Sequence, residues 1–589
     1  MFDAPNFALF DDNLADGGDV LLDELASVIR CERAEDVSAC FAEIEAARRR
    51  GCWIALAARY ELGLVFEERL KRHLPNTGEP LFTAWVFTRA QRLEAEATTA
   101  ALAAHPGVAG VAGLRAAQSH ATYCDAVERI RAYIDAGDCY QVNYTFPLEG
   151  ELYGDPLALY AQLRASQPVR YGAFLRHAHG TILSRSPELF VERRGRRLTC
   201  RPMKGTAARE SDPQELLDSE KNRAENLMIV DLIRNDLGRL AALGGVHVES
   251  LFDLEAYPSV WQLTSTVHAE PVDADLETVM RALFPCGSIT GAPRIRAMEI
   301  IAELEAQPRG VYCGALGWIA PDGDFRFSVP IRTLEVDREN RVRCGIGSGI
   351  VIDSVASDEW AECRLKSRFM AACRAGFGLI ETLRCESGAA EPMPLLERHL
   401  MRLSRSAAYF GFACDSDQIR DALRAQAHAL PVGVHRVRLE LAQDGSYALT
   451  HAPLAPLPTG QRVRVSSRRV AAHDPLRRHK TTDRALYDAE LARAVPDGVF
   501  DVLFFNEHDE LCEGARSAVF VTNDEGELLT PPLECGLLDS VYRRLLLDEG
   551  RAREAVITRT QFARAREVWV ANALRGLIEV SVEGWHSDQ

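Results

Sequence analysis

Apolar and polar positions follow two different periods along residues 122–374, and together they predict a mixture of helices and strands. Apolar residues recur at helical spacing in TYCDAVERIRAYIDAG and in KNRAENLMIVDLIRNDLGRL, so we predict amphipathic helices over 122–137 and 221–240. Runs rich in β-branched and aromatic residues predict strands. These runs are YQVNYTF (140–146), VYCGALGWIA (311–320) and RFSVPIRTLEV (326–336), and a further helix is predicted over 357–374.

The pattern changes at two places that organise the chain. Residues 92–121 are rich in Ala and Gly without a clear period, so we predict a poorly patterned connector there. FGLIETLR (377–384) predicts a fresh strand just after a helix, which places a domain boundary near Ala375. Neither half alternates strands and helices strictly. Both are therefore predicted to be α+β, with mixed or antiparallel sheets, in domains over 1–374 and 375–589.

Composition narrows the classes of function. The chain has 589 residues, of which 47% are hydrophobic and 26% charged, as expected for globular domains. A net charge of −17 argues against binding to nucleic acid or to anionic membranes, although a local cluster of Arg and Lys could still bind a small anion. No apolar run reaches the roughly 18 residues of a membrane span. The 15 cysteines form no C-x-x-C pair, which is typical of reduced thiols, and we expect a cytoplasmic protein.

Two glycine-marked segments in the first half could bind an anion. FPCGSITGAPRIRAMEII (284–301) places small polar residues before a predicted helix, whose first N–H groups attract negative charge. CGIGSGIVIDS (344–354) is predicted as a second glycine-rich loop. It is not a dinucleotide fingerprint, because Ile350 stands where the third glycine would fall. Taken singly, each segment is more often a tight turn.

Charged residues in both halves allow two interpretations each. Glu225 opens one predicted helix, while Glu359 and Glu362 share a face of another. They could form solvated charged faces or bind magnesium. Lys204, in RPMKGT, and Lys480, in RRHKTTD, could be ordinary solvated lysines or reactive amines. Spacing alone does not separate these interpretations.

Nine segments of the first half, taken in order, resemble the chorismate-utilising enzymes, the family of anthranilate, aminodeoxychorismate, isochorismate and salicylate synthases. The resemblance covers about residues 122–369. It implies a large α+β domain with two sheets and a substrate buried between them. The segments are GDCYQVNYT, SRSPELF, RPMKGT, ENLMIVDLIRNDLGR, FPCGSITGAPRIRAMEII, GVYCGALGW, IRTL, GIGSGIV and DEWAECRLKS.

The resemblance implies roles for residues of this chain. Glu225 and Glu362 would bind Mg2+, with Glu359 close by, and the metal would hold the ring carboxylate of chorismate. Glu188 would be the general acid that protonates the departing 4-hydroxyl. Arg332 and Tyr312 would bind the enolpyruvyl carboxylate, and further substrate contacts would come from Thr206, Thr290, Gly347 and Gln141.

Two positions separate members of that family, and a third departs from many of them. Isochorismate- and salicylate-forming members carry a water-activating lysine where this chain has Gln141, so the resemblance favours ammonia as the nucleophile. Anthranilate-forming members usually have Ala at the position of Lys204. Lysine there is typical of aminodeoxychorismate synthases, in which the amine is proposed to attack ring C2 before ammonia displaces it by attack at C4. Many relatives have His where Gln262 stands, and in anthranilate formation that His helps to expel pyruvate.

The ammonia must come from glutamine or from solution. A glutaminase needs a cysteine on a tight elbow, roughly G-x-C-x-G, and none of the 15 cysteines sits in that pattern. We therefore expect a glutamine amidotransferase partner, with free ammonia as the alternative.

An ordered set of segments in residues 375–589 resembles the fold-type IV pyridoxal-phosphate enzymes, which include branched-chain and D-amino-acid aminotransferases and aminodeoxychorismate lyase. The resemblance implies that Lys480 forms the Schiff base, that Glu513 pairs with the pyridinium nitrogen and that Arg402 binds the phosphate. The resemblance is also compatible with a homodimer that forms through this domain. Backbone groups around Val541 and Tyr542, with Asn572 and Ala573, would complete the phosphate cup.

The second half also departs from that pattern. Ala518 replaces the usual Asn of S-N-x-F, and Asp539 and Ser540 replace the usual P-G, while NALR (572–575) looks closer to lyases. The fusion favours a lyase that converts aminodeoxychorismate into 4-aminobenzoate and pyruvate, with Lys480 as acid and base, and hence a bifunctional enzyme of folate synthesis. The alternatives are an aminotransferase with another substrate and a degenerate, non-catalytic domain.

Overall fold

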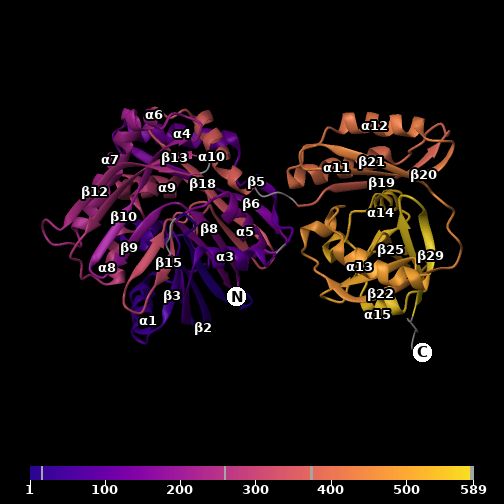
Figure 1. Cartoon of the computed structure of the whole chain (residues 1–589), viewed down its shortest axis with the longest axis horizontal. Helices are drawn as coiled ribbons and strands as arrows, with labels where there is room; N and C mark the ends of the chain where they lie inside the picture. The colour runs from indigo at the N-terminus through magenta and orange to yellow at the C-terminus, as the bar shows by residue number, and fades with distance from the viewer. Residues whose placement is uncertain (15–17, 106, 258–259, 372–375, 584–589) are drawn as a thin grey trace. The chain divides into compact units, whose positions relative to one another are not determined.

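The computed structural model describes residues 1–14, 18–105, 107–257, 260–371 and 376–583, and these divide into two units (Figure 1). The predicted boundary near Ala375 lies outside the described residues. Among the residues that are described, no helix is both long enough and apolar enough to cross a membrane. The first unit comprises Met1–Gly107, Leu114–Gly150 and Asp155–Cys373, and the second comprises Val108–Gly113, Glu151–Gly154 and Arg374–Gln589.

The first unit is built on one hydrogen-bonded network of strands where two separate sheets were expected. Neighbouring strands pair in antiparallel fashion, as β2 (Asp19–Cys31) does with β4 (Phe82–Leu93). Helices and strands are mixed, which confirms the predicted α+β class. The other strands are β1 (Phe7–Asp11), β3 (Trp53–Ala58), β5 (Gly110–Ala116), β6 (Gln141–Tyr153), β7 (Tyr171–His177), β8 (Gly180–Ser186), β9 (Leu189–Arg194), β10 (Arg197–Arg201), β11 (Met203–Ala208), β12 (Val246–Ala256), β13 (Val260–Ala269), β14 (Gly291–Ala292), β15 (Ala315–Ile319), β16 (Phe325–Ser328), β17 (Thr333–Asp337) and β18 (Arg341–Ile350).

Two predicted helices of this unit begin at capping side chains. The Ser119 hydroxyl accepts from the Thr122 N–H at the start of α4 (His120–Asp135), and Ser219 accepts from the Asn222 N–H at the start of α7 (Glu220–Gly238). The helices predicted over 122–137 and 221–240 are thereby confirmed. The other helices are α1 (Val37–Arg49), α2 (Leu62–Phe66), α3 (Ala95–Ala103), α5 (Pro156–Ser166), α6 (Pro213–Asp218), α8 (Leu276–Leu283), α9 (Arg294–Leu304) and α10 (Ala356–Ala371).

The helices α7 and α10 carry the acidic residues of interest. α7 packs on β11, β12 and β13, and α10 packs on α4 and β18 (Figure 1). Ile229, Val230, Ile233 and Leu237 form the buried side of α7. Glu225 lies outside this buried side of α7.

Two predicted segments of the first unit are wrong in detail. Residues 92–121 contain α3 and β5 where a connector was predicted. The helix forms because alanine favours helix even where no amphipathic stripe exists. The strand predicted over 326–336 is split into β16 and β17. Pro330 cannot donate to a strand ladder, and Arg332 has a φ of 51°, so neither residue continues the strand.

The second unit begins with a three-stranded antiparallel sheet, β19 (Leu379–Ser387), β20 (Gly433–Leu441) and β21 (Tyr447–Pro453). The helices α11 (Leu396–Phe410) and α12 (Ser416–Ala429) lie over it (Figure 1). The apolar residues of α11 recur at helical spacing, so one face of this helix is buried against the sheet. These residues are Leu396, Leu400, Leu403 and Ala407.

An eight-stranded mixed sheet follows in the second unit. β22 pairs in parallel with β23 and β29, and an additional pairing of β24 with β25 closes the sheet on itself. The elements are β22 (Gln461–Val470), α13 (Ala485–Ala494), β23 (Asp501–Asn506), β24 (Leu511–Gly514), β25 (Ala518–Thr522), β26 (Leu528–Thr530), α14 (Val541–Asp548), β27 (Arg553–Glu554), α15 (Arg559–Ala563), β28 (Glu567–Asn572) and β29 (Gly576–Glu583).

Candidate active sites

Lys204 lies on β11 at an irregularity of the strand pairing. Where β11 pairs with β13, Met203 faces Thr264 and Thr206 faces Gln262, so β11 has one extra residue in this interval. An extra residue of this kind is a β-bulge, which bends a strand and redirects a side chain. Within RPMKGT, residues 203–206 therefore form a bulged part of β11.

Three of the four charged residues with the largest effects on Lys204 are other predicted site residues. Burial lowers the pKa of the Lys204 amine, and Lys366 lowers it further, while Glu225, Glu188 and Glu362 act in the opposite direction. The structure thus brings the predicted nucleophile, the predicted acid and two predicted metal ligands together. Because desolvation favours the neutral amine, the environment of Lys204 shifts it toward the form that the predicted nucleophile would need.

Glu188 is buried between β8 and β9, where its carboxyl accepts a hydrogen bond of 2.6 Å from the Ser288 hydroxyl. Burial raises the pKa of Glu188 to about 7, although the Ser288 bond and the charge of Lys204 act against this. A carboxyl with this pKa holds a proton near neutrality, as a general acid requires. Ser288 was not predicted as a site residue; the only signal for it was its place in the 284–301 segment.

The three carboxylates expected to bind magnesium differ in their contacts. The Glu362 carboxylate lies 2.7 Å from Lys366 Nζ, which also donates to the Gly347 carbonyl at 3.0 Å. Glu359 instead accepts from a serine hydroxyl at 2.7 Å. Glu225 forms no ion pair with any described residue. Within the described ranges, no group of three or more Asp, Glu, His or Cys side chains is arranged to hold a metal ion.

Glu225 and Glu362 fit a magnesium ion better than Glu359 does. Both act on Lys204 electrostatically, so both lie near this lysine. Magnesium is commonly bound by one or two carboxylates, with water and substrate oxygens completing its shell. The contact of Glu362 with an ammonium group also indicates that this carboxylate accepts a cation.

Arg332 lies between β16 and β17, and burial lowers the pKa of its guanidinium group. Among the described residues this half-buried guanidinium group forms no ion pair with a carboxylate, so it remains available to bind an anion. Tyr312 is also buried, and its ring packs beside a glycine of β18. These properties suit the carboxylate binding predicted for the pair.

The glycine-rich loop predicted over 344–354 is wrong, because residues 341–350 form the strand β18. Its glycines make room for neighbouring side chains. A Cβ at Gly345 would lie 2.1 Å from the Tyr312 ring, one at Gly347 2.5 Å from a carbonyl, and one at Gly349 2.7 Å from the Gln141 amide. Since these neighbours are distant in sequence, the local pattern could not reveal them. Gly347 offers its carbonyl to Lys366 and was predicted as a substrate contact.

The other predicted substrate contacts differ in whether a polar side-chain atom lacks a hydrogen-bond partner. Gln141 is buried and donates to Asn143 at 3.2 Å, but its Oε1 has no hydrogen-bond partner among the described residues. Thr290 donates its hydroxyl to the Cys286 carbonyl at 3.1 Å. Thr206 donates its hydroxyl to a side chain of β13 at 3.0 Å. Of these three, Gln141 has the buried acceptor that a ligand could satisfy.

Lys480 lines a cavity of about 430 Å³ in the second unit. The Ile380 N–H donates to the Lys480 carbonyl at 2.8 Å, and Thr481 bridges to Leu379, so the lysine is fixed where the two sheets of this unit meet. Six of the seven predicted cofactor residues line the cavity: Lys480, Arg402, Glu513, Val541, Asn572 and Ala573.

Tyr542 is the predicted cofactor residue that does not line the cavity. Its ring packs against the apolar cluster of Phe520 and Leu546, and its hydroxyl lies beside Gly576. Only the backbone of Tyr542, near the start of α14, is available for the predicted phosphate cup.

Burial lowers the pKa of Lys480 to about 8. Arg402 and Arg484 lower it further, against the opposite effects of Glu381 and Glu513. The neutral amine is therefore accessible near neutrality, which both Schiff-base formation and proton transfer require.

Glu513 is buried and accepts from the Tyr487 hydroxyl and, at 3.1 Å, from the Leu538 N–H. Burial raises the pKa of its carboxyl. A positively charged ring nitrogen beside it would favour the ionised carboxylate, so this residue fits the pyridinium partner of the predicted cofactor.

Arg402 is more fully bonded than the sequence predicted. Its Nε donates to Glu381 at 2.8 Å, its Nη2 also bonds Glu381, and its Nη1 donates to the Asp539 carbonyl at 3.2 Å. Burial opposes ionisation of Glu381, but Arg402 and His399 lower its pKa to about 2. Glu381 was missed, although it lies in the quoted FGLIETLR segment. A phosphate would meet Arg402 only at the edge that Glu381 leaves free.

Two residues near the predicted phosphate cup fix turns of the backbone. The Asn572 side chain accepts from the N–H groups of Leu574 and Arg575, at 3.1 Å each. Asp539 lies 2.7 Å from Arg405 and 3.2 Å from the α14 residue Arg544. The departure at Asp539 therefore replaces a rigid turn residue with an ion-paired one.

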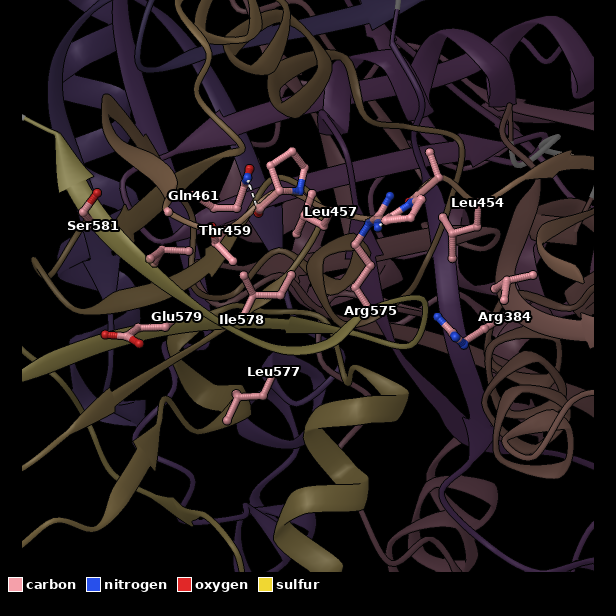
Figure 2. Close-up of a pocket in the computed structure, with 16 residues that line it drawn as sticks. Arg384, Leu454, Leu457, Thr459, Gln461, Arg575, Leu577, Ile578, Glu579 and Ser581 are labelled. Carbon is pink, nitrogen blue, oxygen red and sulfur yellow. Dashed lines mark hydrogen bonds between the residues drawn. The ribbon is translucent and has the colours of Figure 1, made fainter.

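A larger groove, about 800 Å³, lies beside this cavity (Figure 2). Residues 454–461, β29, Arg384 and Arg575 line it, and Arg575 lines the Lys480 cavity as well. Arg384 donates to the Leu574 carbonyl at 3.1 Å. None of the seven predicted cofactor residues lines the groove, so the candidate chemistry belongs to the smaller cavity.

Residues 34–372 match the family described as chorismate binding enzyme. The chain belongs to the chorismate binding enzyme family. Residues 378–582 of this chorismate binding enzyme match a second family, amino-transferase class IV. Both resemblances seen in the sequence are thereby confirmed.

Relatives of this chorismate binding enzyme carry two different names. Aminodeoxychorismate synthase component 1 of Klebsiella aerogenes is 43% identical over 256 residues, which are 42% of this chain and 56% of that relative. Anthranilate synthase component 1 of Streptomyces coelicolor is 42% identical over 277 residues, 46% of this chain and 54% of that relative. The chain thus spans about half the length of these curated relatives, and identity alone does not separate the two names.

A solved structure agrees with the fold of the first unit. The crystal structure of anthranilate synthase component I from Streptococcus pneumoniae matches with a TM-score of 0.53 at 23% identity, and covers 61% of this chain and 93% of that one. This likeness concerns the fold, and the product must be argued from the site residues.

Proposed function

We propose that this chain carries out two consecutive reactions of 4-aminobenzoate synthesis for folate. The first unit aminates chorismate to 4-amino-4-deoxychorismate, and the second converts that product into 4-aminobenzoate and pyruvate. The ammonia is supplied by a glutamine amidotransferase partner. In support of a partner, the similar aminodeoxychorismate synthase is named a component 1, and none of the 15 cysteines here lies in a glutaminase elbow.

The observation that carries the first reaction is the meeting of Lys204 and Glu188. Burial lowers the pKa of the amine, which shifts it toward its neutral form, and raises that of the carboxyl to about 7, which lets it hold a proton near neutrality. Lys204 attacks ring C2 while Glu188 gives its proton to the 4-hydroxyl, which leaves as water. Ammonia then bonds to C4, and the lysine amine leaves C2.

The remaining groups of the first unit bind the two carboxylates of chorismate. Magnesium, when bound, supplies positive charge for the ring carboxylate, and Glu225 and Glu362 are the residues that would hold it. Arg332 orients the enolpyruvyl carboxylate, for which a guanidinium group without a carboxylate partner is suited.

The second unit is suited to a substrate that carries both an amino group and carboxylate groups. Pyridoxal phosphate, when bound, supplies an electron sink. Lys480 moves the proton at the substrate carbon that bears the amino group, and Glu513 would pair with the ring nitrogen of the cofactor. Arg436, Arg516 and Arg575 line the cavity and, among the described residues, form no ion pair with a carboxylate. This excess of positive charge suits a substrate with two carboxylates and favours the lyase over an aminotransferase of neutral amino acids.

Lys204→Ala tests the first reaction, with chorismate, ammonia, magnesium and a separately supplied lyase. Only the 4-amino isomer yields 4-aminobenzoate, so the variant should give almost none. It should release a 2-amino species slowly and little anthranilate, because Gln262 replaces the His that helps to expel pyruvate. A wild-type rate of 4-aminobenzoate would show that Lys204 is not the nucleophile.

Two measurements test the second reaction. The purified protein should show an absorbance band near roughly 410–430 nm from the cofactor bound at Lys480, and Lys480→Ala should lack it. Supplied aminodeoxychorismate should yield 4-aminobenzoate and pyruvate. Transfer of an amino group from a neutral amino acid to a keto acid, without 4-aminobenzoate formation, would instead support the aminotransferase alternative.

A further inference from the structure

The bulge that presents Lys204 is bonded from the neighbouring strand by a single side chain. Gln262, on β13, donates from Nε2 to the Gly205 carbonyl at 2.9 Å and accepts at Oε1 from the Thr206 hydroxyl at 3.0 Å. The two bonded residues follow Lys204 directly on β11. One amide group therefore grips the bulge at two successive residues.

The backbone of this bulge has more conformational freedom than a regular strand. Gly205 has a φ of 92°, in the region that glycine reaches at low cost and that other residues rarely adopt. An extra residue in a strand lacks its own partner on the neighbouring strand. If the bulge moved by one residue, Lys204 would turn to the opposite face of the sheet, because side chains alternate along a strand.

The chemistry of the amide matches the task. A glutamine side chain both donates and accepts hydrogen bonds, so it can bond a carbonyl and a hydroxyl together. A charged carboxylate could not donate to the Gly205 carbonyl. The Gln262 oxygen and one of its N–H groups are thus engaged within the protein, and neither needs a ligand.

We propose that Gln262 is a positioning residue for Lys204: its amide holds the bulge in the conformation that turns this lysine toward Glu188 and Glu225. The proposal rests on the proposed role of Lys204 and adds a residue that does not touch substrate. It also gives Gln262 a role beyond the absence of a histidine.

Gln262→Met is the variant of choice, because it keeps the length of the side chain and removes both hydrogen bonds. Ammonia-dependent amination of chorismate is measured across pH at constant free ammonia. The kcat should fall about 10- to 100-fold, since small displacements of a reacting group have effects of this size. The KM for chorismate should change by less than about threefold, because binding and positioning are separate here.

The pH profile gives a signature that a merely structural role would not. In the wild type, enclosure lowers the pKa of Lys204, so the neutral amine forms at lower pH. When the bulge relaxes and the lysine becomes more solvated, its pKa rises, and the limb where the rate increases with pH must move to higher pH. Thr266→Val, on the same strand but beyond the β11 pairing, is the matched control and should leave kcat and the limb unchanged.

Unchanged kcat and an unmoved limb in Gln262→Met would overturn the proposal. So would a fall in kcat with an unmoved limb, matched by lower thermal stability. Should Gln262→Met fail to fold, the nearly isosteric Gln262→Glu replaces it, and a wild-type kcat in that variant at neutral pH would equally overturn the proposal. Lys204→Ala is run in parallel: if it still forms the 4-amino product at the wild-type rate, the role of Lys204 itself fails, whatever Gln262 does.

Discussion

The two candidate sites each bury a lysine whose pKa is lowered, but their charged neighbours differ in sign. Burial is the first cause of the lowered pKa in both. The charged residues that act on the pKa of Lys204 are mainly acidic. For Lys480, the largest effects of charge come from two arginines. The neighbours of Lys204 are Glu225, Lys366, Glu188 and Glu362, and those of Lys480 are Arg402, Arg484, Glu381 and Glu513.

This difference separates two ways of binding an anion. An acidic site cannot accept an anionic substrate until a cation neutralises it, so the first unit is expected to depend on magnesium. A site rich in guanidinium groups attracts carboxylates and phosphates directly. Desolvation thus shifts both lysines toward their neutral form, and the sign of the neighbouring charges differs between the two sites.

Lys480→Ala should have the largest effect, and it should abolish the reaction of the second unit while sparing that of the first. Formation of 4-aminobenzoate should fall by at least about 10³-fold, within the range of general acid–base groups. Chromatography should show aminodeoxychorismate accumulating, because Lys204 belongs to the other unit. Continued production of 4-aminobenzoate would sink the lyase assignment.

Glu381→Ala should destabilise the second unit by about 3–5 kcal/mol, because it leaves Arg402 buried without its partner. Calorimetry should show one shifted transition. The pKa of Glu381 is lowered from 4.5 to about 2, so its stabilisation is present above pH 4.5 and is lost as pH falls toward 2. The gap between wild type and variant should therefore narrow in acid. Glu386→Ala, at an exposed position of β19, is the control and should have little effect.

Glu362→Ala should show whether the reaction of the first unit, and not that of the second, depends on magnesium. Amination of chorismate should fall on the order of 100-fold, since a lost metal ligand removes charge stabilisation. The conversion of supplied aminodeoxychorismate should be unaffected, and a chelator should reproduce this split in the wild type. Full magnesium-dependent turnover in the variant would show that Glu362 is only part of a charged helix face.

The pH dependence of the first reaction should show the smallest effect. Because the pKa of Glu188 is raised to about 7, its protonated form is lost as pH rises through that value. At constant free ammonia, and once Lys204 has lost its proton, amination should then fall by about tenfold per pH unit. A rate that keeps rising well above pH 7 would remove Glu188 from the role of proton donor.

Sequence patterns predicted what depends on neighbours in the chain. The helix over 221–240 was found as Glu220–Gly238, because its cap and its apolar stripe are local signals. The glycines of β18 were misread as a loop, because the ring of Tyr312 that they accommodate comes from another part of the chain. Glycine marks a close approach as well as a turn, and only the tertiary structure distinguishes the two.

The candidate sites divide in the same way. Lys204, Glu188 and Lys480 were identified through resemblance, and their surroundings agree with the predicted chemistry without having been tested. Glu381 and Ser288 were missed, although both lie in quoted segments. Each acts by contacting a residue far away in sequence, at 2.8 and 2.6 Å. Residue type alone does not reveal such a partner.

The bulge at Lys204 also makes the length of this segment a constraint of its own. Deleting one residue between Met203 and Thr206 would restore even pairing with β13 and straighten the strand. The flanking positions would keep their partners on β13, but the bulge that directs Lys204 would be lost. Sequence variants of this chain could therefore exchange side chains around RPMKGT more easily than they could gain or lose a residue there, so insertions and deletions should be rare in this stretch even where substitutions accumulate.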